Sequence, residues 1–158
     1  MYRALYRYLA VCSLWMTMSI GGSNALATSG VDACAMLSAA DITKAAGLAV
    51  ENGTAGAAIP GVLGKCTWAG PGDTKVILTL ADAPHMQMTM AAQERSGASA
   101  VEGVGSKAVA MKGATLTGHA YIVSVLDAKG GFGISVLGAD GTPERALALA
   151  RLVEGRRQ

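Results

Sequence analysis

The sequence has few aromatic side chains and no surplus of charge, and both shortages exclude functions. Only 4% of the 158 residues are aromatic, and beyond residue 27 the aromatic side chains are Trp68, Tyr121 and Phe132. Three are too few for a base-stacking platform. Arg3 and Arg7 account for the whole formal charge of +2, so the rest of the chain has as many basic as acidic side chains. We therefore expect no nucleic-acid partner, because no net positive charge attracts one.

The chain also lacks an apolar run long enough to cross a bilayer. Residues 9–20 form an apolar run that is well short of the ~20 residues needed. The run follows Arg3 and Arg7 and precedes Ala25-Leu26-Ala27, the small-x-small pattern of a signal cleavage site. This predicts a secretory signal over residues 1–27 and no stable membrane span after its cleavage. It also predicts that the protein is exported and is periplasmic or extracellular.

Cysteine is scarce, and the two cysteines beyond the predicted signal are informative. Residues 28–158 have the length of one domain and contain only Cys34 and Cys66. In an oxidising compartment this pair predicts a disulfide that stabilises the fold by roughly 3–4 kcal/mol. A redox dithiol or a metal thiolate site is the alternative. The wide spacing and the absence of a C-x-x-C motif favour a structural disulfide.

Capping residues predict the helices near the two ends of this domain. Ser38 is a good N-cap, Asp41 is placed to complete a capping box, and Gly47 supplies a left-handed stop. Near the C-terminus Thr142 precedes a proline at the first helical position, and we expect this helix to end at Gly155.

Runs of β-forming residues predict an antiparallel sheet. The runs CTWAG and TKVILTLAD flank a Gly-Pro-Gly turn and predict a hairpin. The runs VGSKAVAM, ATLTGHAYIVSVLD and FGISVLG predict a meander with turns at Lys112-Gly113 and at Ala-Lys-Gly-Gly. Residues 121–126 are apolar on both faces, which predicts a position in mid-sheet. The fold class is therefore α+β, with an antiparallel β-sheet of about five strands packed with two or three helices and one disulfide.

The richest cluster of potential metal ligands is HMQMTM, which contains His85, Met86, Met88 and Met90. Thioether and imidazole groups suit copper, especially Cu(I). On a strand the three sulfurs would share one face, whereas on a helix Met88 would point away from the other two. Asp82 as a cap and Pro84 near the start favour a helix over residues 82–96, and methionine is also an ordinary core residue.

Two segments resemble nucleotide-binding motifs, but neither contains all of the residues that its motif requires. GKCT lacks the earlier glycine and the hydroxyl residue of a phosphate-binding loop, and GGFGISVLG lacks the third glycine of a dinucleotide fingerprint. We therefore expect no enzyme. We expect instead a small secreted or periplasmic binding or sensor-like module for a small molecule or an extracytoplasmic protein. The candidate groove residues are Trp68, Met88, His119 and Tyr121. A periplasmic copper-binding protein is the alternative.

Four segments together resemble a known family. These segments are CAMLSAADITKAAG, KCTW, VILTL and VEGVGSKAV. They are similar to segments of secreted lipoproteins of unknown function, which are related to the extracellular sensor domain of PknH-type bacterial receptor kinases. The resemblance covers roughly residues 34–152. It implies an α+β domain, a disulfide between Cys34 and Cys66, and an extracytoplasmic binding or sensing role. Family members often carry an N-terminal lipid anchor, for which this chain has no convincing lipobox.

Overall fold

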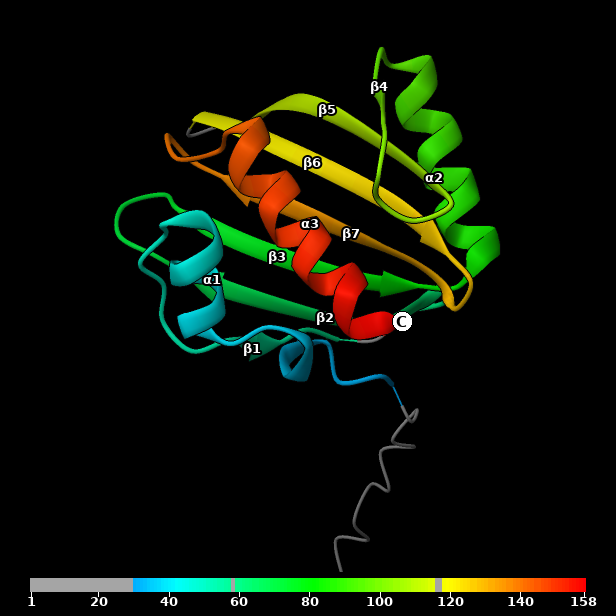
Figure 1. Ribbon diagram of the computed structural model, residues 1–158. Helices are drawn as coiled ribbons and strands as arrows, with labels where there is room; N and C mark the ends of the chain where they lie inside the picture. Colours follow the sequence, from blue (N-terminus) through cyan, green and yellow to red (C-terminus); the bar gives the residue numbers. More distant parts are fainter. Residues whose placement is uncertain (1–29, 58, 116–117) are drawn as a thin grey trace, which may run out of the picture.

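The protein is a seven-stranded antiparallel sheet with helices on both faces (Figure 1). The computed structural model describes residues 30–57, 59–115 and 118–158, so the predicted signal at 1–27 lies outside the described residues. The strands are β1 Thr54–Ala55, β2 Val62–Ala69, β3 Lys75–Ala81, β4 Ser99–Val101, β5 Lys107–Thr115, β6 Gly118–Asp127 and β7 Gly130–Leu137. The helices are the 3-10 turn η1 Ala33–Met36, α1 Ala39–Ala46, α2 Ala83–Arg95 and α3 Pro143–Arg157. The predicted α+β class is confirmed.

The sheet order is β1-β2-β3-β7-β6-β5-β4. It exceeds the predicted five strands by two short edge strands, β1 and β4, which have two and three residues. The predicted hairpin is confirmed, since β2 pairs with β3, and the predicted meander is confirmed in its strand order, since β5 pairs with β6 and β6 pairs with β7. Strand β6 lies between β7 and β5, in agreement with its mid-sheet prediction.

Two predicted breaks are wrong. Strand β5 continues through Lys112-Gly113, and Gly113 pairs with Ala120 in the ladder. Helix α3 continues through Gly155 to Arg157. In both places tertiary pairing decides the outcome, because neighbouring residues are held by β6 and a glycine can remain in regular structure when its neighbours are held.

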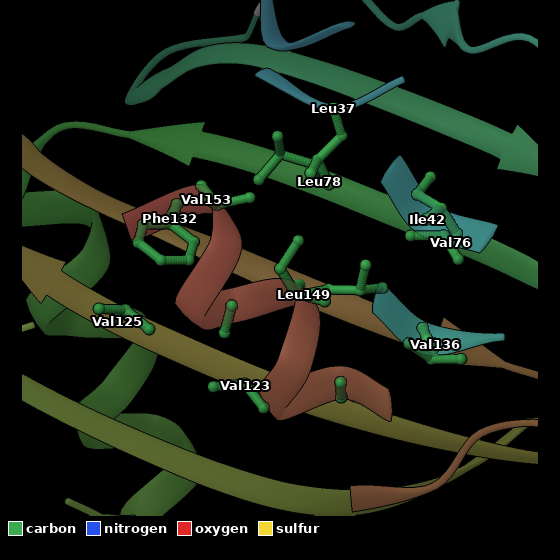
Figure 2. Close-up of a cluster of buried hydrophobic side chains, with 14 of the residues drawn as sticks. Leu37, Ile42, Val76, Leu78, Val123, Val125, Phe132, Val136, Leu149 and Val153 are labelled. Carbon is green, nitrogen blue, oxygen red and sulfur yellow. The ribbon is translucent and has the colours of Figure 1, made fainter. Parts of the chain in front are cut away.

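The main core lies between the sheet and the helices α1 and α3. Figure 2 shows Leu149 and Val153 of α3 directed at the sheet beside Leu78, Val123 and Phe132, all of which are fully or almost fully buried. Cys34 of η1 is bonded to Cys66 of β2, so the predicted disulfide is confirmed and joins the first described turn to this core. In the part of the chain that the structure describes, no helix has the length and apolarity to cross a membrane.

Helix α2 covers one end of the opposite face. Its buried residues Met86 and Met90 pack with Ala81 and Val109. The approach is close because β7 has a glycine beneath the helix: a Cβ atom at Gly131 would lie 2.4 Å from Cγ of Met86. A larger side chain at Gly131 would therefore push α2 away from the sheet.

Candidate functional site

The predicted methionine cluster lies on a helix, as its flanking residues indicate. The Asp82 carboxylate accepts a hydrogen bond from the His85 N–H at 2.8 Å, and Ser96 is the C-cap, so the helix prediction is confirmed. Met86 and Met90 are buried, whereas 67% of the Met88 surface is exposed. The helix therefore separates one sulfur from the other two.

The predicted groove residues lie on both sides of the sheet. Trp68 and Tyr121 share one cross-strand row, but one residue of β3 and one of β7 lie between them. The two residues are therefore three strand spacings apart, which corresponds to about 14 Å. Trp68 is buried in the main core, and His119 is exposed at the start of β6. Met88 projects from α2, on the other side of the sheet.

The face beside α2 has an apolar strip beyond the helix. Ile77, Ser135, Ile122 and Met111 form one cross-strand row there, and Leu137 lies on the same face in the next row. All five are half-buried. None of these five side chains is charged, but the exposed Lys75 pairs with Leu137 on the same face.

A pocket of about 230 Å³ lies where the C-terminal turn of α3 meets the β6–β7 turn and the start of β5. Its lining residues come from three separate segments: Gly105, Ser106, Asp127, Ala128, Lys129, Glu154, Arg157 and Gln158. None of these residues is among those predicted for the groove or the metal site. The only local signals were the Ala-Lys-Gly-Gly turn and the consecutive arginines after Gly155, and neither indicates a hollow.

Arg157 is the buried cation of this pocket, with 8% of its side chain exposed. Its Nε donates to Oδ2 of Asp127 at 2.6 Å and its Nη2 donates to Oδ1 at 3.1 Å. Its Cζ lies 5.6 Å from the centre of the Phe132 ring, within range of a cation–π interaction. Within the described parts of the chain, no acceptor lies within hydrogen-bond distance of Nη1.

The Asp127 carboxylate is saturated by its neighbours. Besides Arg157, it accepts the N–H of Lys129 at 2.8 Å. Burial by itself would raise the pKa of Asp127, but the hydrogen bonds from Arg157 and Lys129 outweigh it and lower the pKa below its usual value. Asp127 is therefore ionised at neutral pH and holds the Arg157 guanidinium in place.

Two further charged side chains lie at the pocket. Glu154 accepts the Gly105 N–H through Oε1 at 2.6 Å, and no donor among the described residues reaches its Oε2. The Lys129 ammonium donates to a main-chain oxygen of Gln158 at 3.2 Å and is otherwise exposed. The lining residues that the structure describes include no histidine or cysteine, and they offer hydrogen bonding and charge pairing.

Elsewhere in the described ranges, no group of three or more His, Cys, Asp or Glu residues is placed to hold a metal ion. Methionine is not among these residue types, so this absence does not bear on the alternative prediction of copper binding by His85, Met86, Met88 and Met90. His85 lies against the backbone: a Cβ atom at Gly61 would lie 2.4 Å from its Nδ1.

Comparison of the chain with models of protein families, with curated proteins and with solved structures gave no match.

Proposed function

We propose that the protein is a small exported binding module that holds a small polar ligand in the pocket beside Arg157. One observation carries the proposal. The Arg157 side chain is more than nine-tenths buried and the residue lines a pocket, while the described residues leave its Nη1 without an acceptor. Buried polar groups are nearly always paired, so an unpaired donor at a hollow is the place where a ligand oxygen gains most.

The location outside the cytoplasm rests on the disulfide and on the predicted signal. A bond between Cys34 and Cys66 persists in an oxidising compartment and is rare in the cytosol. The balanced charge of the chain beyond residue 27 supports recognition of a specific ligand rather than general attraction to anionic surfaces.

Binding without catalysis follows from the groups at the pocket. The Asp127 carboxylate already accepts hydrogen bonds from Arg157. The Ser106 hydroxyl donates to the Leu126 carbonyl at 3.0 Å. A nucleophile needs an adjacent base that can take its proton, and here the nearest carboxylates already accept strong hydrogen bonds. We therefore propose recognition and not turnover.

The test is a thermal-shift screen of small polar compounds combined with amide NMR spectra. A ligand at a hundred times its Kd stabilises the fold by about 2.7 kcal/mol and raises Tm by several degrees. We expect at least one compound to do this and to move the amide signals of Gly105, Lys129 and Glu154.

The matched variants are Lys129→Ala at the pocket and Lys112→Ala, an exposed lysine on β5. The first should weaken the binding of that compound, and the second should leave it unchanged. A screen without any stabilising compound, or binding that ignores Lys129→Ala and moves only signals elsewhere, would refute the proposal.

A further inference from the structure

Three charged residues that line the pocket have hydrogen-bonding atoms that the described residues leave open, and these atoms are of both signs. On the cationic side are Arg157 Nη1, which has no acceptor among the described residues, and the exposed Lys129 ammonium, which makes one hydrogen bond. On the anionic side is Glu154 Oε2, the carboxylate oxygen that the Gly105 N–H leaves open. A ligand that satisfies both sides needs an acceptor group and a donor group.

The acceptor group is best supplied by a carboxylate. A guanidinium forms its strongest hydrogen bonds to carboxylate or phosphate oxygens, and an ammonium beside it adds charge. Asp127 accepts the N–H of Nε and one N–H of Nη2, so the other edge of Arg157 offers a ligand the two N–H groups of Nη1 and the second N–H of Nη2. Lys129, on the turn next to Asp127, is the second donor that such a group can reach.

The side-chain charges around the pocket make a ligand with only a negative charge a poor fit. Arg157 and Lys129 balance Asp127 and Glu154, so the four side chains at the pocket are together neutral. A bare carboxylate would add one uncompensated negative charge close to Glu154, whereas a neutral zwitterion would place its ammonium there. Size sets the other limit, since about 230 Å³ lies below the usual ~300–1,000 Å³ of sites for drug-sized ligands.

We infer that the pocket binds a small zwitterionic amino acid, whose carboxylate pairs with Arg157 Nη1 and Lys129 and whose ammonium pairs with Glu154 Oε2. This inference rests on the proposed function and specifies its ligand class. Both ends of the ligand are recognised by charge, and the volume admits only a short side chain.

The test compares three probes of similar size that differ in their charged groups: L-alanine, propionate and ethylamine. Their dissociation constants are measured by amide NMR titration of the full chain. L-alanine should bind at least ten-fold more tightly than propionate or ethylamine and should move the signals of Gly105, Lys129 and Glu154.

Two conservative variants assign the two ends of the ligand. Glu154→Gln retains an oxygen for the Gly105 N–H but removes the negative charge, and it should abolish the preference for L-alanine over propionate. Lys129→Ala should weaken L-alanine several-fold. Glu144→Gln, an exposed glutamate in the first turn of α3, is the control and should have no effect. None of these variants removes the buried Arg157, so loss of folding does not obscure the result.

Propionate or ethylamine binding as tightly as L-alanine at these residues would overturn the inference while the proposed function stood. The same holds if none of the three probes moves the pocket signals but another compound from the thermal-shift screen does. If no compound of any kind moves them, both the inference and the proposed function fail.

Discussion

Asp41 and Arg156 form a two-bond ion pair that joins α1 to α3. Nη2 of Arg156 donates to Oδ1 of Asp41 at 2.7 Å, and Nη1 donates to Oδ2 at 2.9 Å. The same Nη1 donates to the carbonyl of Met36, the last residue of the disulfide-bonded turn η1, at 2.7 Å. One arginine near the C-terminus thus holds the first described helix against the last.

This pair makes stability depend on acid. Hydrogen bonds from Arg156 and then from Ser38 hold the pKa of Asp41 well below its usual range. A group with a lowered folded-state pKa stabilises the fold above its unfolded pKa, near 4 for aspartate, and this contribution is lost as pH falls further. We expect Tm to drop between about pH 4.5 and 2.

The variant Asp41→Asn should have a lower Tm than the wild type at pH 7, and the difference should shrink as pH falls to 2. Asp73→Asn, in the exposed turn before β3, is the matched control and should follow the wild-type curve. The pair would not be the cause if the Asp41→Asn and wild-type curves stayed parallel throughout this range.

Removal of one partner from the buried pair Arg157–Asp127 should cost more than removal of both. Only 8% and 13% of the two side chains are exposed. Asp127→Leu leaves an uncompensated buried guanidinium and should lower the free energy of unfolding by roughly 3–5 kcal/mol, whereas the double variant Asp127→Leu/Arg157→Met should recover a large part of it. Urea unfolding of the two single variants and the double variant measures the coupling.

The exposed pair Lys107–Glu94 is the control for this cycle. Its side chains are 53% and 41% exposed, so Lys107→Met should change the free energy of unfolding by no more than ~1 kcal/mol. Equal losses for Lys107→Met and Asp127→Leu would show that burial does not set the strength of the Arg157 pair.

Helix α2 should depend on its buried methionines and not on the exposed one. Met90 is 1% exposed, so Met90→Ala should destabilise the protein by roughly 2–5 kcal/mol through lost burial and a cavity. Met88→Ala removes a side chain that is 67% exposed and should stay within about 0.5 kcal/mol of the wild type. Thermal unfolding of the two variants decides; similar losses would mean that Met88 is covered in solution.

Elements with local signals could be predicted from the sequence. The Ser38–Asp41 capping box and the Asp82 cap both form as predicted, because each needs only residues three positions apart. Gly113 and Gly155 were wrongly predicted to end regular structure, since a glycine permits a turn or a helix end but does not require one. Contacts with β6 decide both cases: Gly113 pairs with Ala120, and Arg157, two residues beyond Gly155, pairs with Asp127.

The pocket could not be predicted for a different reason. Gly105, Asp127 and Glu154 lie in three segments that are more than twenty residues apart and meet only when the sheet and α3 pack together. In the sequence Arg157 is one of two arginines that follow Gly155, and only the tertiary structure shows that its side chain is buried. The disulfide was easier to predict, because the two cysteines beyond the predicted signal allow only one bond between them.

The split of the methionine cluster leads to a last prediction, for copper. On α2 successive side chains are about 100° apart, so Met88 lies about 200° from Met86 and Met90 packs with Met86 in the core. His85 and Met88 are the two donors of the cluster with exposed surface, and two soft ligands leave Cu(I) weakly held. We therefore expect the protein to take no Cu(I) from a competing chelator such as bathocuproine disulfonate. Stoichiometric uptake that disappears in the triple variant Met86→Leu/Met88→Leu/Met90→Leu would contradict this, because the buried sulfurs could reach the metal only if α2 left the sheet.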